Sequence, residues 1–346
     1  MTRKPTPATP AASLIRAVLL TPALWLLIPP GHLHATDTPP RTSQPNGAAS
    51  AQIDLAAPAA SRDVAQLEEK ARQKDPDALN KLGLAYLEGG DVSQDDVKAA
   101  EYFRKAADLG YWKGQLNLGL MYARGRGLAK DPGEALQWIQ RAADQGVSEA
   151  QLDLAVLLDQ GKEVPKNFKE AITWYEKAAT GGSAPAAAEL GRIYLAVNDE
   201  GIPRDFAAAA KWFRQAAEAG DPKAQNSLGI MLQFGYGVEK NLDEAVKWYE
   251  RAVDQGDAKG QLNMGRLYCF ADGLYRDNIA AYKWFSLSAG QGDGIAQNIL
   301  REFKNALNPE ERAEAEYQIK LYKEAHPAAN PPAEKANPPA VASPQK

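Results

Sequence analysis

The chain has 346 residues, of which 45% are hydrophobic and 24% charged, with one cysteine and three histidines. A single cysteine excludes an intrachain disulfide framework. The histidines are His32, His34 and His326, so the stretch 35–325 has no imidazole for a metal site or a catalytic relay. The formal net charge of −4 lacks the basic balance typical of nucleic-acid-binding proteins. We therefore expect no nucleic-acid partner and no bound metal.

The first 35 residues have the pattern of a secretory signal peptide. Arg3, Lys4 and Arg16 precede the apolar run Ala17–Ile28, which is shorter than the roughly 20 residues that cross a bilayer. We expect cleavage after Ala35, a periplasmic or secreted chain, and contact with the membrane only during export. Cleavage would remove three basic and no acidic residues, changing the net charge from −4 to −7. An uncleaved inner-membrane anchor is the alternative.

Proline marks the ends of the folded region. Sixteen of the 23 prolines lie before Ser61 or after His326, and proline interrupts helices. The composition predicts a disordered Pro/Ala-rich spacer over residues 36–60, a helical region over residues 61–325 and a disordered Pro/Ala-rich tail over residues 326–346.

The central region repeats every 36 residues, with one spacing of 38. Leu-Gly or an equivalent pair returns with its small residue at Gly83, Gly119, Ala155, Gly191, Gly229 and Gly265. An aromatic series follows the same spacing at Tyr102, Trp138, Trp174, Trp212, Trp248 and Trp284. A third series ends each repeat at Gly110, Gly146, Gly182, Gly220, Gly256 and Gly292. Three series in one register predict a stacked array. We expect its small residues to allow close helix contacts and its aromatic rings to fill the core.

Each repeat has the pattern of two helices joined by a glycine turn. In the second repeat, Leu118 and Tyr122 share one face of a helix that runs from Gly114 to Arg124. The segment Gly125-Arg126-Gly127 ends that helix, because glycine adopts backbone angles that other residues avoid.

The second helix of each repeat begins with a capping pattern. Asp131 is expected to cap this helix in the second repeat, with Pro132 at its first position and Glu134 completing a capping box. The same device returns in two later repeats, as Asn167 with Glu170 and as Asn241 with Glu244.

The motif A-x-x-x-L-G-x-x-Y, followed by G-x-G-V/L and A-x-x-W-x-x-x-A-A-x-x-G, resembles the Sel-one-like repeat, a relative of the tetratricopeptide repeat. Residues 115–146 and 225–256 carry it almost completely, and residues 77–292 accommodate six repeats before a varied seventh. The resemblance implies an all-α fold, an α-α superhelix or solenoid of about six to seven helix-turn-helix repeats. Cap helices are expected at Ser61–Lys74 and Asn308–Ala325.

In related tetratricopeptide arrays the first helix of each repeat lines the concave surface, so the resemblance implies a binding face there. The positions that the repeat leaves variable are the candidates for partner binding: Lys113, Asn117, Arg124, Asp153, Gln160, Glu189, Arg192, Phe234, Tyr236, Arg266 and Phe270. Aromatic residues often anchor interfaces. Packing between repeats is the alternative role for Phe234 and Phe270.

These features favour a non-catalytic scaffold or adaptor of the bacterial envelope that binds a protein or peptide and needs no cofactor. The resemblance extends to adaptors, envelope regulators, host-interaction factors and neutralisers of secreted toxins. The acidic charge favours a basic or neutral partner. One alternative is a hydrolase that acts on cell-wall glycan or β-lactams through carboxylates or serine, although most carboxylates are placed as helix caps. Self-assembly through the array ends is another alternative function.

Cys269 is expected to be a partly buried apolar residue, with an interchain disulfide as its alternative.

Overall fold

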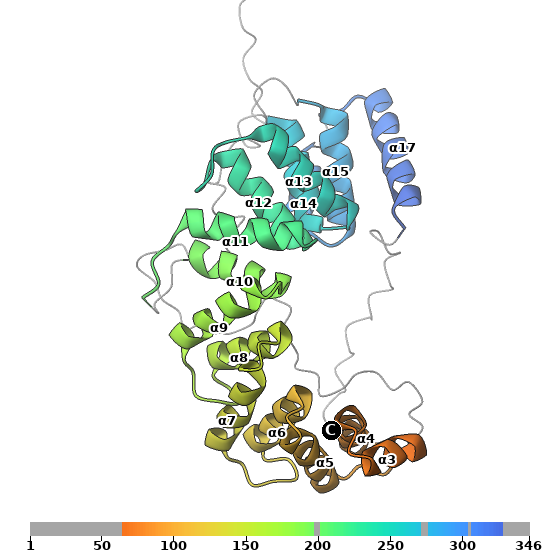
Figure 1. Cartoon of the computed structure of the whole chain (residues 1–346). Helices are drawn as coiled ribbons and strands as arrows, with labels where there is room; N and C mark the ends of the chain where they lie inside the picture. The colour runs from red at the N-terminus through yellow and green to blue at the C-terminus, as the bar shows by residue number, and fades with distance from the viewer. Residues whose placement is uncertain (1–63, 197–200, 271–275, 304–305, 328–346) are drawn as a thin grey trace, which may run out of the picture. The chain divides into compact units, whose positions relative to one another are not determined.

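The computed structural model describes residues 64–196, 201–270, 276–303 and 306–327, and at residue 270 the backbone alone. The predicted signal peptide, the spacer and almost all of the tail lie outside these ranges. The described residues form helices and no strand (Figure 1). The helices are α3 (Val64–Arg72), α4 (Pro76–Glu88), α5 (Asp96–Asp108), α6 (Trp112–Arg124), α7 (Pro132–Ala143), α8 (Ser148–Gln160), α9 (Phe168–Thr180), α10 (Ala184–Leu195), α11 (Phe206–Glu218), α12 (Pro222–Phe234), α13 (Leu242–Asp254), α14 (Ala258–Phe270), α15 (Asn278–Gly290), α16 (Gly294–Phe303) and α17 (Pro309–Ala325). Within the described ranges, none of these helices combines the length and apolarity that a membrane span requires.

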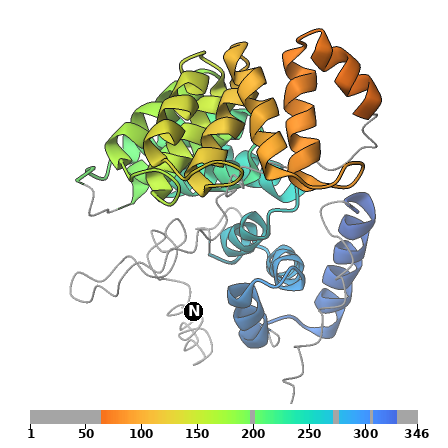
Figure 2. The ribbon, with the colours of Figure 1, turned by 90° about the horizontal axis from the view of Figure 1, so that it is seen from below.

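The chain divides between Pro203 and Arg204 into two compact units. We call the part that ends at Pro203 the first unit and the part that begins at Arg204 the second unit. The division falls inside the fourth repeat, at the connection that carries its two extra residues. In the first unit, successive helices from α4 to α9 stack one beside the next (Figures 1 and 2). The predicted all-α solenoid is therefore confirmed.

Each repeat contains, in chain order, one even-numbered helix followed by one odd-numbered helix. We call the even-numbered helices α4 to α14 the first helices and the odd-numbered helices α5 to α15 the second helices. Each described first helix packs against a neighbouring second helix, and first helices also meet one another, as α4 with α6 and α12 with α14. Apolar burial along these contacts is continuous within each unit, as expected for an array whose repeats are stabilised by their neighbours.

The Leu-Gly series exists because a ring or branched side chain of the second helix lies directly against the glycine. A Cβ added at Gly83 would lie 2.5 Å from Phe103, and one added at Gly265 would lie 2.5 Å from Phe285. The same approach recurs at Gly119, where the neighbour is Ile139. Since real Cβ contacts are never this short, the small residue is required by helix–helix packing.

The tryptophans of the aromatic series are buried in packing, as predicted. A basic side chain on the same helix also covers the face of each ring. In three repeats it lies one turn later, with Lys177 Nζ 3.5 Å from the ring centroid of Trp174 and Arg251 4.4 Å from that of Trp248. Such cation–π contacts add to the apolar burial of a ring. The rings are therefore structural parts of the second helices.

The predicted N-caps are confirmed, but the predicted capping boxes are wrong. Asp131 Oδ1 accepts the backbone N–H groups of Gly133 and Glu134. Glu134 instead accepts the indole N–H of Trp138 at 3.2 Å, because the backbone N–H of Asp131 already donates to the carbonyl of Tyr122 in the first helix. Two later pairs, Asn167 with Glu170 and Asn241 with Glu244, follow the same arrangement. A complete capping box occurs at Asn308 and Glu311, at the start of α17.

The glycine turn holds consecutive repeats together. Gly125 adopts a left-handed conformation and ends α6, and Gly127 has a φ of +64°. Between them, Arg126 forms an ion pair of 2.6 Å with Asp96, the first residue of α5 in the preceding repeat. The turn therefore joins the second repeat to the first.

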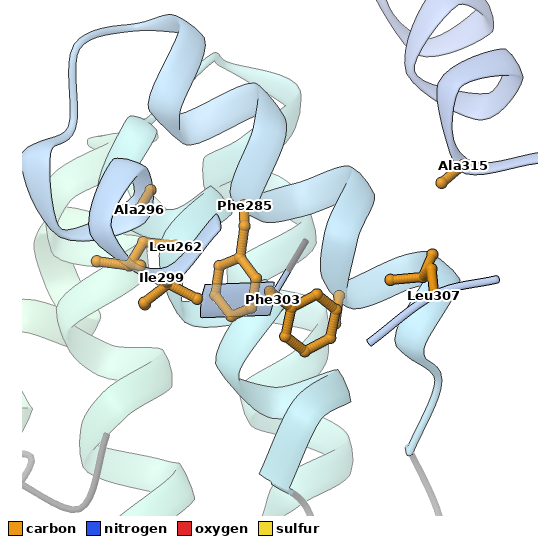
Figure 3. Packing of buried hydrophobic residues seen from close by; sticks show 8 residues of the cluster. Leu262, Phe285, Ala296, Ile299, Phe303, Leu307 and Ala315 are labelled. Atoms are coloured by element: carbon orange, nitrogen blue, oxygen red, sulfur yellow. The ribbon is translucent and has the colours of Figure 1, made fainter. Parts of the chain in front are cut away.

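The predicted terminal helices are present. α3 lies within the range expected for the N-terminal cap. In the second unit, α16 and α17 close the array through an apolar cluster in which Phe285 and Phe303 meet edge to face, with Ile299 beside them (Figure 3). Tyr322 on α17 donates a hydrogen bond of 2.6 Å to the carbonyl of Val253.

Candidate functional site

The candidate binding face follows the first helices, and the structure exposes it unevenly. In the second repeat, Lys113 and Arg124 are exposed near the helix ends, but Asn117 between them is only 8% exposed. Asn117 donates a hydrogen bond of 2.9 Å to the side chain of Asn80 on α4. The neighbouring Leu120 is buried as well. At this repeat, Asn117 therefore serves the packing of adjacent first helices rather than a free surface.

The third and fourth repeats leave the face more open and make it strongly charged. Gln160 is exposed, and Arg124 lies 3.6 Å from Glu163 on the following turn. On α10, Glu189 accepts two hydrogen bonds from the guanidinium of Arg192, at 2.8 and 3.0 Å. Arg124 and Arg192 are therefore paired within the chain.

Asp153 is a charged side chain on this face for which no ion pair or hydrogen bond is seen among the described residues. It occupies the position of Asn117 one repeat later, but Leu116 stands where the first repeat has Asn80, so no amide is offered to it. Burial, with repulsion from Glu149 as a smaller contribution, raises the pKa of Asp153 to about 7.

Asp153 is expected to make the stability of the fold depend on pH. Its pKa is higher in the folded chain than in the unfolded chain, so the folded state binds the extra proton between about pH 4 and pH 7 and loses stability as the pH rises through that window. We expect Asp153→Asn to raise the free energy of unfolding by about 1–3 kcal/mol at about pH 8.5 and to change it little at about pH 3.5. Urea unfolding at both pH values measures this. Asp108→Asn, at an exposed position on α5, is the control. Equal effects of Asp153→Asn at the two pH values would contradict the expectation.

The second unit carries an aromatic cluster of Phe206, Phe234 and Tyr236. Tyr236 stacks between the other two rings, with centroid distances of 5.5 Å to Phe206 and 5.8 Å to Phe234. The guanidinium of Arg204 lies 5.7 Å from the ring centroid of Phe206. Phe234, the last residue of α12, remains 45% exposed. The cluster therefore presents one open ring on a rigid support.

Sequence reasoning missed Phe206 and Arg204. A comparison between repeats could have found Phe206. Asp96 and Arg126, which pair at the glycine turn of the second repeat, are 30 residues apart. Phe206 and Tyr236 have the same separation and occupy the equivalent positions. An aromatic stack thus replaces an ion pair at this turn.

The remaining candidates lie on α14. Arg266 is half-buried and forms no ion pair with any residue that the structure describes. Phe270 ends the helix, and its side chain lies outside the described residues. Cys269 is partly buried against the apolar cluster, as predicted, and burial raises the pKa of its thiol to about 11. This thiol is therefore protonated at neutral pH and is a poor nucleophile. Across the ranges covered by the structure, no group of three or more His, Cys, Asp or Glu side chains is arranged to hold a metal ion.

Comparison with known proteins agrees with this geometry. The Sel1 repeat family matches six consecutive segments, 76–111, 112–147, 148–183, 184–221, 222–257 and 258–293. A protective antigen of uropathogenic Escherichia coli with an SLR fold shares 30% sequence identity, over 82% of this chain and 68% of its own, with a TM-score of 0.52. A Sel1 repeat protein from Oxalobacter formigenes is also 30% identical, over 66% of this chain and 93% of its own, with a TM-score of 0.54. No curated protein sequence matches the chain.

Sel1 repeat proteins generally mediate protein–protein interactions and are typically non-catalytic scaffolds. The six matched segments cover more than half of this chain, and each contains the Leu-Gly or equivalent pair and the aromatic position described above. The chain therefore belongs to the Sel1 repeat family.

Proposed function

We propose that this chain is an exported, non-catalytic scaffold of the bacterial envelope that binds a protein or peptide partner through its first helices and the adjoining aromatic cluster. Export is supported by the sequence of residues 1–35, with its basic start and apolar core. Binding without catalysis is supported by the family and by the pairing of Arg192 with Glu189 on α10.

The observation that carries the binding surface is the exposed ring of Phe234. It is held by Tyr236, which is held in turn by Phe206, so the ring loses little conformational freedom when a partner covers it. Rigid aromatic side chains of this kind dominate binding energy at many interfaces. The ring therefore serves as the anchor of the interface.

Capture of the partner from the envelope tests this proposal. The full-length chain with a C-terminal tag is expressed, the periplasmic fraction is collected, and bound proteins are recovered with wild type and with Phe234→Ala. We expect the tagged chain in that fraction, and we expect Phe234→Ala to reduce recovery of the specific partner at least about tenfold, since anchor residues cost more than ~1.4 kcal/mol when truncated.

Leu109→Ala is the matched control, because Leu109 is 47% exposed but belongs to no aromatic cluster. Its partner recovery should equal that of wild type. Unchanged recovery with Phe234→Ala, with helical content intact by circular dichroism, would contradict the binding surface. Absence of the chain from the periplasmic fraction would contradict export.

A further inference from the structure

The array contains two arginines in equivalent positions with opposite surroundings. Arg192 on α10 and Arg266 on α14 are 74 residues apart, which is two repeats, and each follows its Leu-Gly or Met-Gly pair directly. Both lie near an equivalent tyrosine of a second helix, Tyr175 for Arg192 and Tyr249 for Arg266. The two sites can therefore be compared residue by residue.

Arg192 is neutralised inside the chain. Glu189, three residues earlier on α10, accepts hydrogen bonds from Nε at 3.0 Å and from a terminal nitrogen at 2.8 Å. Asp159 adds a second negative charge, and these carboxylates together raise the pKa of the guanidinium. This arrangement is a bidentate arginine–carboxylate pair of the strong kind.

At Arg266 both carboxylates are replaced by amides. Asn263 stands in the position of Glu189, and Gln233 stands in the position of Asp159. The Gln233 side-chain oxygen is already occupied by the hydroxyl of Tyr249, which donates to it at 2.7 Å. Arg266 therefore keeps the frame of Arg192 but has lost both negative partners.

Two polar atoms at this place are buried without a hydrogen-bond partner, Nε of Arg266 and Oδ1 of Asn263. Asn263 is only 3% exposed, and its amide nitrogen donates to Asn226 at 2.8 Å, which fixes the side chain. Burial lowers the pKa of Arg266, against an opposing effect of Asp293, whose carboxylate is held by Lys259 at 2.6 Å. A buried polar atom without a hydrogen-bond partner costs stability, and the charge of Arg266 has no carboxylate paired with it among the described residues.

We propose that the guanidinium of Arg266 binds the side-chain carboxylate of a glutamate or aspartate of the protein partner. The partner's carboxylate supplies the negative charge that Glu189 supplies to Arg192. An arginine fork matches a carboxylate in two parallel hydrogen bonds, which gives the site its chemical preference. This inference rests on the proposed scaffold function and names the chemistry of the segment that is bound.

Nuclear magnetic resonance of the arginine Nε–H groups in the full chain tests the inference. The probe is the blocked peptide acetyl-Ala-Glu-Ala-amide, its neutral counterpart is acetyl-Ala-Gln-Ala-amide, and the Arg266 signal is assigned by its loss in Arg266→Lys. We expect a saturable shift of the Arg266 signal with the glutamate peptide and none with the glutamine peptide. No shift with the glutamate peptide, or equal shifts with both, would overturn the inference.

Asn263→Glu is the decisive variant, because it places a carboxylate three residues before Arg266 as Glu189 stands before Arg192. We expect it to weaken binding of the glutamate peptide at least about tenfold with unchanged helical content, since the internal carboxylate competes for the same donors. Arg192→Gln is the matched control and should leave binding unchanged within about twofold, because its guanidinium is already paired. Unaffected binding in Asn263→Glu would overturn the proposal.

Two further outcomes would also overturn it. A response only to acetyl-Ala-Ala-Ala with a free C-terminus would assign the site to a terminal carboxylate. A shift of the Arg266 signal on Glu334→Gln in the peptide-free chain would mean that the chain's own tail occupies the site. Failure here with Phe234-dependent partner capture intact would leave the scaffold proposal standing, whereas failed capture with peptide binding intact would contradict the scaffold alone.

Discussion

Replacement of Gly127 by alanine is expected to lower the free energy of unfolding of the first unit by about 3–5 kcal/mol. A Cβ at this position would lie 2.0 Å from the carbonyl oxygen of Asp96 and 2.9 Å from the backbone nitrogen of Val97. These backbone atoms begin α5 and cannot move without shifting the helix. The left-handed backbone at φ +64° adds ~1–2 kcal/mol to the ~2–3 kcal/mol expected from the clash.

Gly146→Ala separates the two contributions. Gly146 also has a positive φ, of +80°, but no atom lies within 4 Å of the position that its Cβ would take. We expect this control to cost only ~1–2 kcal/mol, from the backbone conformation alone. Urea unfolding followed by circular dichroism measures both variants. Equal losses for the two would mean that the glycine turn does not hold the repeats together.

The repeat pattern was sufficient to predict the fold. Residues at a fixed spacing, such as Gly83 and Gly119 or Trp138 and Trp174, serve the same packing contact in each repeat, so the sequence repeats because the contact repeats. Helix starts were equally visible, because a capping side chain such as Asp131 acts on backbone groups two and three residues away. Local and periodic interactions are the ones that a sequence displays directly.

Interactions between helices were less visible. Glu134 was placed in a capping box because its spacing from Asp131 fits one, but a carbonyl from the preceding helix had already taken the backbone N–H that a box requires. Asn117 was counted among surface candidates, yet its side chain is buried against Asn80 in the adjacent repeat. Both outcomes depend on which group of a neighbouring helix forms the hydrogen bond. The spacing of residues along one helix does not contain that information.

In the candidate site too, the sequence displayed the candidate residues but not the contacts that they make. The variable positions of the first helices placed both Arg192 and Arg266 among the candidates, and the structure separates them: Arg192 is paired with Glu189 and Arg266 is without a carboxylate. The difference is legible in the sequence once Asn263 is recognised as the counterpart of Glu189 two repeats later. Comparison between repeats is therefore a better guide to function in this array than the character of any single residue.

Trp174→Ala is expected to destabilise the first unit by about 3–5 kcal/mol, the range for deletion of a large buried side chain. Trp174 lies in the middle of α9 and is 4% exposed. Its ring is closed on one face by Lys177, and its indole N–H points to Glu170 at 3.4 Å. Alanine would leave a cavity at a contact between repeats, and an array held by neighbour contacts has no distant core to compensate. Urea unfolding measures the loss.

Trp174→Phe is the matched control, because it keeps an aromatic ring in the same space and removes the indole N–H. We expect it to cost less than ~1.5 kcal/mol, as for other replacements that nearly conserve volume. The large difference between alanine and phenylalanine would show that the ring acts by filling space between helices. A loss below ~1 kcal/mol for Trp174→Ala would instead mean that the ring contributes little to packing, and the aromatic series would then be free to stack on a ligand.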